Sequence, residues 1–470
     1  MEVSVISTES IRPWSSSAGR DNEFKPFKLC LLDQLMFSTH APVVLFYPMK
    51  EAHHPDEKMV ARWLKESLSK TLNPFYPVAG RVKDNLVIHD FEKGVPFTEA
   101  RVKGHSLSDV LTSPRGGGGP KLEFLNNLLP FEPFCQGHEN VASGSHAQVS
   151  VQLNTFDCGG IAIGINLYHK LMDGATTSAF LHTWGANCSN DPQLKKQPEL
   201  HKASSVFPPK HSIPIESQTF SDRMLFEDVG GQRRRQGASR RFVFDEKAIA
   251  TLRTKARLSV LHPTRLEALS AFIWESALRA TAAAGDAQQL MFLMQGVNMR
   301  QLMSPRLSKH SLGNLVATAM ASCVDSSNRS MEELVSLIRD GNLRVDENYL
   351  NAISGDQGFP TMMQGQKFLQ EITGGFSRKT LACSSWVGFG FNNFDFGWGK
   401  PIWSGLFGDP SGEHPFMNNT IIFKEVAARG HGRSKAIEAW IRLDEDVMAL
   451  LEHDAHFLEY ASPNPPLILD

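Results

Sequence analysis

A hairpin of two strands that ends at a histidine most constrains how this chain can fold. Segments 147–156 (AQVSVQLNTF) and 161–169 (IAIGINLYH) alternate with the two-residue period of a strand. The connection between them, DCGG, is short and glycine-rich, as in turns that reverse an antiparallel pair. If the second strand continues to its end, His169 points to the same side as its isoleucines. The sequence therefore predicts an antiparallel pair with His169 where the sheet ends.

Amphipathic helices are expected at several places along the chain. Segment 60–72 gathers five apolar residues on one face, namely Val60, Trp63, Leu64, Leu68 and Leu72. Thr264 with Glu267, and Ser330 with Glu333, have the spacing of capping boxes that begin further helices. A fourth helix follows the turn at 170–174. Helices mixed with hairpin strands and isolated strands indicate an α/β protein with mixed sheets.

The length indicates two large domains, because 470 residues are about three times the usual domain size. Regular patterning lapses between about 190 and 240, where proline, lysine and serine are frequent. We expect an N-terminal domain at 1–195, a crossover linker at 196–240 and a C-terminal domain at 241–470. A second weak segment, SPRGGGGPK at 113–121, is expected to be a surface loop.

Charge and apolar content argue against nucleic acid and membrane as partners. Lysine and arginine number 48 against 50 acidic residues, and the most apolar windows fall well short of the ~18 residues that span a bilayer. The six cysteines show no CxxC pair, and the N-terminus does not resemble a secretory signal, so we expect free thiols and a cytoplasmic protein. The one basic cluster is either a solvated loop or a docking patch for a phosphorylated ligand; it comprises Arg233, Arg234, Arg235, Arg240 and Arg241.

The pair His169 and Asp173 admits two interpretations on its own. Asp173 is a suitable N-cap for the next helix, and His169 a suitable buried imidazole with satisfied nitrogens. The alternative is catalysis. Zinc lacks a third protein ligand, so no metal site is expected. The sequence has no GxSxG, its GGGG run lacks the GK[ST] ending of a phosphate loop, and no HRD motif precedes DFG at 395–397. A histidine without a nucleophile beside it indicates a general base that acts on a substrate's own hydroxyl.

Two motifs in this order carry a resemblance to a known family. HKLMDG at 169–174 matches an HxxxD motif, and DFGWGKP at 395–401 matches a second signature. Other segments match family landmarks in family order, among them LCLLDQL at 29–35, VNMR at 297–300, SLGNL at 311–315 and SSW at 384–386. Over nearly its whole length the chain resembles the BAHD family of plant acyl-CoA-dependent acyltransferases, most of all the branch that acetylates alkaloid and terpenoid alcohols.

The resemblance implies a fold and a set of site residues. The fold is α/β, with two similar domains of the chloramphenicol acetyltransferase type, each a mixed sheet flanked by helices, and a solvent channel between them. His169 is then the general base, and Asp173 pairs with Arg300 as structural support. Ser384 and Trp386 are expected to stabilise the oxyanion, and Ser270 to lie near CoA. The second signature is expected to be structural: Asp395, Gly397, Trp398 and Gly399.

The resemblance also implies an activity. We expect a monomeric enzyme with no tightly bound cofactor, which uses acetyl-CoA as co-substrate and acylates the hydroxyl of a small-molecule alcohol in a ternary complex. Benzoyl-CoA or hydroxycinnamoyl-CoA donors and amine acceptors remain alternatives, and so does an inactive relative that binds a metabolite or a partner protein. Tyr168 departs from the family, where serine is commoner before the histidine; it either reshapes the acceptor side or packs inward.

Overall fold

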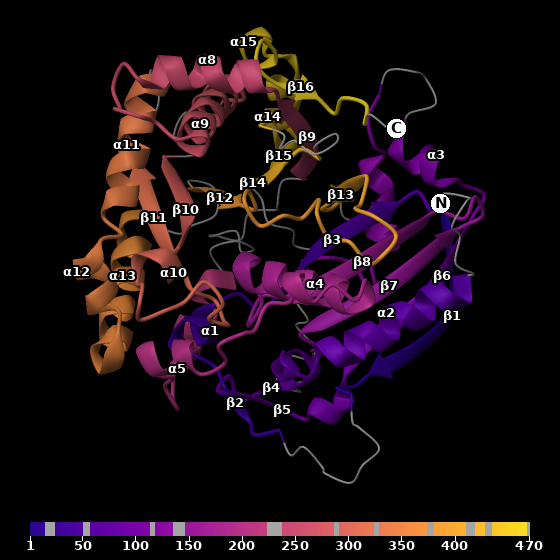
Figure 1. Ribbon diagram of the computed structural model, residues 1–470. Coiled ribbons are helices and arrows are strands. Elements are labelled where there is room, and N and C mark those ends of the chain that lie inside the picture. The colour runs from indigo at the N-terminus through magenta and orange to yellow at the C-terminus, as the bar shows by residue number, and fades with distance from the viewer. Residues whose placement is uncertain are drawn as a thin grey trace.

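Two mixed β-sheets with flanking helices form the protein (Figure 1). The computed structural model describes residues 1–14, 24–49, 57–112, 118–134, 146–222, 237–285, 291–323, 329–373, 380–409, 419–427 and 435–467. Arg233, Arg234, Arg235, Cys135 and most of the expected loop at 113–121 lie outside these ranges. Both sheets and their helices agree with the α/β class that the sequence predicts.

The first sheet has six strands in the order β1-β6-β7-β8-β3-β13. Neighbours are antiparallel except β6 and β7. The predicted hairpin is confirmed, since β7 and β8 pair antiparallel with Val151 opposite Ile165. The strands are β1 (Glu2–Ile11), β3 (His40–Tyr47), β6 (Val95–Lys103), β7 (Val149–Phe156), β8 (Ile161–Tyr168) and β13 (Trp403–Gly405).

Helices α2 (Glu57–Thr71) and α4 (Gly174–Cys188) pack on one face of this sheet, against the isoleucines of β8. The helix expected at 60–72 is thus confirmed, with Leu64 and Leu68 fully buried. Trp63 of the same apolar stripe is 39% exposed. It lies at the edge of the apolar stripe, where the helix has already turned away from the sheet.

The second sheet has seven strands in the order β11-β10-β12-β14-β15-β9-β16. β12 runs parallel to both β10 and β14, so this sheet is mixed as well. The strands are β9 (Gly237–Phe244), β10 (Phe292–Asn298), β11 (Val316–Ser322), β12 (Thr380–Ser385), β14 (Thr420–Glu425), β15 (Ile437–Asp444) and β16 (Ser462–Pro463).

Four helices bury the outer face of the second sheet: α8 (Glu246–Ala256), α9 (Arg265–Ala283), α11 (Met331–Leu343) and α14 (Glu445–His453). Both predicted capping boxes are confirmed, at Thr264 with Glu267 for α9 and at Ser330 with Glu333 for α11. Each box satisfies backbone N–H groups that the first turn of a helix leaves unpaired.

β13 joins the two halves, because it comes from the last third of the chain and pairs with β3 of the first sheet. Trp403 of β13 donates from Nε1 to Glu438 of β15, at 3.2 Å. Arg241 and Lys424 form buried ion pairs with the same carboxylate, which together hold the pKa of Glu438 at about 2 despite its burial. The solvated-loop interpretation was therefore wrong for Arg241, and Arg240 lies beside it on β9, where it pairs with Glu452.

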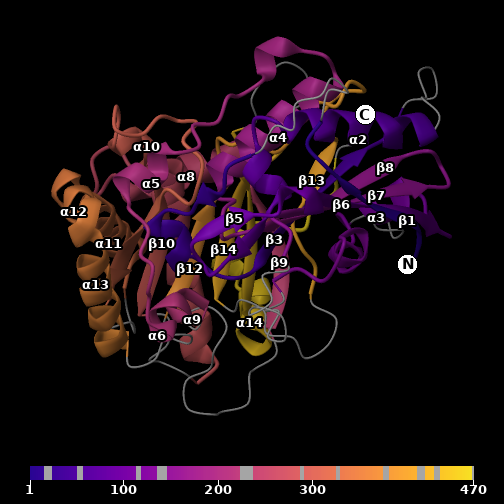
Figure 2. The ribbon, with the colours of Figure 1, turned by 90° about the horizontal axis from the view of Figure 1, so that it is seen from below.

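The remaining elements lie around these sheets (Figure 2). A small sheet contains β2 (Phe27–Lys28), β5 (Val87–His89) and β4 (Arg81–Lys83). The other α-helices are α1 (Leu31–Leu35), α3 (Leu107–Leu111), α5 (Lys202–Val206), α6 (Ile215–Gln218), α10 (Met299–Leu302), α12 (Glu347–Ala352), α13 (Gly358–Thr373) and α15 (Ala455–Leu458). Within the described ranges, none of the helices has the length and apolar content that a membrane crossing requires.

Candidate active site

His169 follows the last residue of β8, so its imidazole lies at the end of the first sheet. Its backbone N–H donates to the carbonyl of Thr39, at 2.8 Å, which extends the pairing of β8 with β3 by one residue. The ring of Phe37 meets the imidazole edge to face, with centroids 4.9 Å apart. The side chain is half-buried. A histidine held in this way retains access to solvent on one side.

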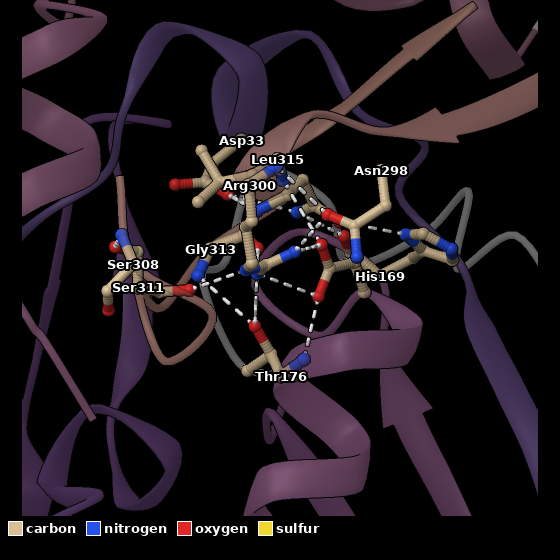
Figure 3. Close-up of polar contacts among 11 residues, drawn as sticks. Asp33, His169, Thr176, Asn298, Arg300, Ser308, Ser311, Gly313 and Leu315 are labelled. Carbon is tan, nitrogen blue, oxygen red and sulfur yellow. Dashed lines mark hydrogen bonds and ion pairs between the residues drawn. The ribbon is translucent and has the colours of Figure 1, made fainter. Parts of the chain in front are cut away.

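The amide of Asn314, which lies between the labelled Gly313 and Leu315 of Figure 3, determines which nitrogen of His169 carries the proton. Asn314 Nδ2 lies 2.8 Å from the carbonyl of His169 and 3.0 Å from a carboxylate oxygen of Asp33. Both of these atoms accept, so this end of the amide must be the NH₂ group. Asn314 Oδ1 therefore faces His169 Nδ1, at 3.2 Å, and accepts its N–H. Nε2 keeps its lone pair and is the basic nitrogen.

Burial lowers the pKa of His169 below its ordinary value, because desolvation disfavours the imidazolium. The hydrogen bond with Asn314 and the charge of Asp173 act in the opposite direction and limit the shift. The imidazole is consequently neutral at physiological pH, which is the protonation state that a general base requires.

Asp173 points to Arg300 instead of the imidazole. Arg300 Nη1 and Nη2 contact the two carboxylate oxygens at 2.7 and 3.1 Å, and both side chains are buried. Asp173 is also the N-cap of α4, since it accepts from the backbone N–H of Thr176. The carboxylate of Asp173 thus caps α4 and pairs with Arg300 at the same time. The expected partners are together; the supporting role that the sequence assigns to them stays a prediction.

A segment of the C-terminal half, residues 308–315, runs past this ion pair and carries Asn314 to the histidine. Arg300 donates to the carbonyls of Ser311 and Gly313. The N–H of Leu315 donates to Asp173. Gly313 has φ +123°, and an added Cβ would lie 3.2 Å from both oxygens of Asp33, so only glycine suits this position. Contacts between the two halves therefore fix the partner of His169.

The proposed oxyanion residues lie at the end of β12. Ser384 is exposed although β12 is a central strand, whereas Ile422, its partner on β14, is buried. Trp386 is half-buried and stacks on Phe391, with centroids 4.4 Å apart. Phe389, three residues after Trp386, packs against Gly174 at the start of α4. This packing brings the end of β12 toward the histidine, although the interactions of the described residues include none that joins His169 to Ser384 or Trp386.

The second signature forms a turn that packs on the first sheet. Asp395 accepts from the backbone N–H groups of Gly397 and Gly399, both of which have positive φ. Trp398 stacks on Phe396 and meets Tyr47 of β3 edge to face. Phe396 is buried in the core of the first sheet and Trp398 packs against that core, whereas Gly397 and Gly399 are exposed. The structural role expected for this segment stays a prediction.

Two further predicted positions are buried. Ser270 is fully buried in α9, and its hydroxyl accepts from Gln295 Nε2 at 2.8 Å, so its expected place near CoA stays a prediction. Tyr168 is buried on the opposite side of β8 from His169 and stacks on His40, with centroids 4.8 Å apart. Inward packing is thus the alternative that holds for Tyr168.

Asp33 and Asn314 were not predicted from the sequence. Both lie inside segments that match family landmarks, but nothing in their spacing shows that Asn314 contacts His169 and that Asp33 contacts Asn314. The described residues contain no cluster of three or more histidine, cysteine or acidic side chains that could hold a metal ion.

Comparison with known proteins gives consistent matches. A profile of the Transferase family matches residues 1–458. Epi-neemfruitin B 7-O-acetyltransferase of Melia azedarach is 34% identical over 99% of both chains. Limonoid 7-O-acetyltransferase of Citrus sinensis is 33% identical, also over 99% of both. The crystal structure of vinorine synthase superposes with a TM-score of 0.78 at 28% identity, and covers 99% of this chain and 100% of that one.

Proposed function

Since this chain belongs to the Transferase family of acyl-CoA-dependent acyltransferases, the BAHD family, we propose that it transfers acetyl from acetyl-CoA to a hydroxyl of a plant alkaloid or terpenoid. Two relatives with at least 33% identity over nearly their whole length are O-acetyltransferases, one of them of limonoids, which supports both the donor and the acceptor class. The single observation that carries the mechanism is the hydrogen bond from His169 Nδ1 to Asn314, which leaves Nε2 free to accept a proton.

The reaction proceeds by direct transfer. His169 Nε2 removes the proton of the acceptor hydroxyl, and the alcohol oxygen attacks the thioester carbonyl. The oxyanion that forms is stabilised by donors from Ser384 and Trp386. Collapse of this intermediate breaks the C–S bond and expels CoA as a thiolate, whose thiol pKa is ~8.5, and the imidazolium returns the proton to it. No acyl-enzyme forms.

Release of free thiol tests the role of His169. Wild-type protein is incubated with acetyl-CoA and a panel of terpenoid and alkaloid alcohols, and compared with His169→Ala. Turnover should fall ~10²- to 10⁴-fold while the fold is retained. Because the pKa of His169 is lowered, kcat/KM should decline only at a pH below ~6.5, where the imidazole becomes protonated.

The matched control is His453→Ala, a surface histidine on α14 whose Nδ1 bonds the carbonyl of Ala449. It should retain wild-type turnover. Equal thiol release by wild type and a folded His169→Ala protein would refute the role of His169 as general base.

The acyl donor is tested with benzoyl-CoA and hydroxycinnamoyl-CoA, each offered with alcohols and amines. Thiol release from one of these and not from acetyl-CoA would replace the proposed donor. Binding of CoA without release would indicate a binding protein.

A further inference from the structure

Behind the imidazole lies a second carboxylate, that of Asp33 on α1, which belongs to neither signature motif. We propose that Asp33 is a positioning residue for the proposed base and acts on His169 through the amide of Asn314. In this chain of three residues Asp33 polarises the amide, and the amide holds the imidazole in its Nδ1–H form and stabilises the imidazolium. The inference rests on the proposed function, in which His169 is the base.

The three side chains form one continuous path of hydrogen bonds. His169 Nδ1 donates to Asn314 Oδ1 at 3.2 Å, and Asn314 Nδ2 donates to Asp33 Oδ1 at 3.0 Å. The backbone N–H of Asn314 reaches the same carboxylate oxygen at 2.7 Å. Asn314 Nδ2 also donates to the carbonyl of His169, so the amide is held at both ends and cannot rotate without the loss of three bonds.

The hydrogen bonds of Asp33 favour the ionised carboxylate. All of its neighbours donate: the N–H and thiol of Cys30, and the backbone and side-chain N–H groups of Asn314. Burial raises the pKa of Asp33, and these donors limit the rise because they bind the carboxylate more strongly than the neutral acid. The buried ammonium of Lys170 lies close enough for its charge to interact with Asp33. Asp33 thus presents a negative charge to the far side of the amide.

Asp173, the aspartate of the HxxxD motif, is already occupied. Its oxygens receive two bonds from Arg300, one from the N–H of Thr176 and one from the N–H of Leu315. The guanidinium neutralises its charge at contact distance. Asp33 has no cation at such a distance among the ion pairs of the described residues, so its charge is the one that can polarise Asn314.

Polarisation matters when the imidazole takes the proton. As Nε2 accepts it, positive charge spreads to Nδ1–H, which stays bonded to Asn314 Oδ1. A carboxylate bonded to the NH₂ end draws the amide toward its charge-separated form and makes Oδ1 a stronger acceptor. No proton leaves Nδ1, and neither Asn314 nor Asp33 changes protonation state. The effect is a more stable imidazolium and a correctly oriented ring.

The test is a double-mutant cycle with Asp33→Asn, Asn314→Ala and the two combined, assayed by thiol release from acetyl-CoA. Each single substitution should lower kcat ~10-fold or more, because a hydrogen bond to a charged group is lost or weakened. KM for acetyl-CoA should not change. If Asp33 acts only through Asn314, the double variant should match Asn314→Ala. In Asp33→Asn the acid limb of kcat/KM should move to lower pH, because a negative charge behind the imidazolium is gone.

A second measurement does not depend on the Asp33 variant folding. Nitrogen chemical shifts of ¹⁵N-histidine-labelled protein, assigned with His169→Ala, should show the Nδ1–H tautomer in wild type and its loss in Asn314→Ala. The control is Ser311→Ala, which removes a hydroxyl bonded to Glu199 from the same segment without touching Asn314. It should lower the melting temperature but leave kcat, the acid limb and the tautomer unchanged.

The outcomes separate this inference from the proposed function. An Nε2–H tautomer in wild type, additive losses in the cycle, or an unchanged acid limb in a folded Asp33→Asn protein would each overturn the role of Asp33. If wild type is active and His169→Ala is not, such a result would leave the base itself in place. No thiol release by wild type with any CoA ester would instead count against the proposed function.

Discussion

At the scale of single residues, the candidate site depends on which hydrogen bonds each side chain already makes. Asp173 has the position of a catalytic partner in the motif, yet its oxygens are taken up by Arg300 and by backbone N–H groups. Asn314 supplies the contact to the imidazole instead. The side chain that bonds the imidazole is thus the amide of Asn314, and not the carboxylate of Asp173 that the motif suggests.

Arg300→Ala should be among the most destabilising single substitutions in the protein. It would leave Asp173 buried without a cation and remove the donors to two carbonyls of the 308–315 segment. Loss of one partner from a buried pair costs about 3–5 kcal/mol of the free energy of unfolding. Urea unfolding measures this quantity. Arg62→Ala removes the exposed pair with Glu66 and should leave the free energy of unfolding nearly unchanged. Similar unfolding midpoints for the two variants would contradict the assignment.

Sequence reasoning identified His169, Asp173 and Arg300 because a motif or a landmark marks each of them. It missed Asn314 because 145 residues separate it from the histidine, and no local pattern records a contact of that kind. Tyr168 shows a related limit. Alternation along β8 places it opposite His169, but only the coordinates show that His40 fills the space beside it. Contacts between distant segments depend on the whole packing.

At the scale of elements, the start of α4 joins the HxxxD motif to the segment that follows β12. Asp173 caps the helix, and the next residue, Gly174, receives the ring of Phe389 from the segment that follows Trp386. Ser178, one turn further on, donates from its hydroxyl to the carbonyl of Phe389 at 2.6 Å. The absence of a side chain at Gly174 thus determines how closely the end of β12 approaches the histidine.

Gly174→Ala tests this close approach. An added Cβ would lie 2.5 Å from the ring of Phe389, so the segment must shift, and overpacking of this kind costs about 1–3 kcal/mol. Turnover should fall as well, because Trp386 moves with the segment. The control is Gly365→Ala in α13, where an added Cβ meets nothing within 4 Å and should add about 0.5–1 kcal/mol of stability. Thermal unfolding and thiol release measure both; a neutral Gly174→Ala variant would argue against the close contact.

Elements with a local signal were predictable, and elements without one were not. Thr264 with Glu267 predicts the start of α9, because a capping box involves only four successive residues. The alternation of apolar residues over 161–168 predicts β8, because it too is a local pattern. β13 has only three residues, and its partner β3 lies more than 350 positions earlier. No periodicity can mark so short a strand.

At the scale of the whole molecule, buried neutral histidines make stability depend on pH. Burial lowers the pKa of His40 on β3 to about 3 and the pKa of His182 on α4 to about 4. Both values lie below the ~6.5 of an unfolded histidine. The unfolded chain therefore binds more protons below pH 6.5, and the free energy of unfolding should fall as the pH drops from 6.5 toward 4.

Each of these histidines should contribute a slope of about 1.4 kcal/mol per pH unit in that window. His182→Gln removes one titration and should flatten the pH dependence by about that amount. His453→Gln, an exposed histidine, should leave it unchanged. Urea midpoints measured at intervals between pH 6.5 and 4.5 compare the three proteins. Parallel curves for wild type and His182→Gln would show that His182 titrates normally in the folded state.

The insertion of β13 also affects how the protein can be made. A ribosome releases the N-terminal half first, and such halves usually fold as they emerge. In this chain the outer edge of β3 has no neighbouring strand until residues 403–405 have been translated. The backbone N–H and C=O groups along that edge stay unpaired during synthesis, and an unpaired edge can pair with another chain. The first sheet is thus completed only near the end of synthesis. A chain that terminates before residue 403 would keep the edge of β3 unpaired and prone to aggregation.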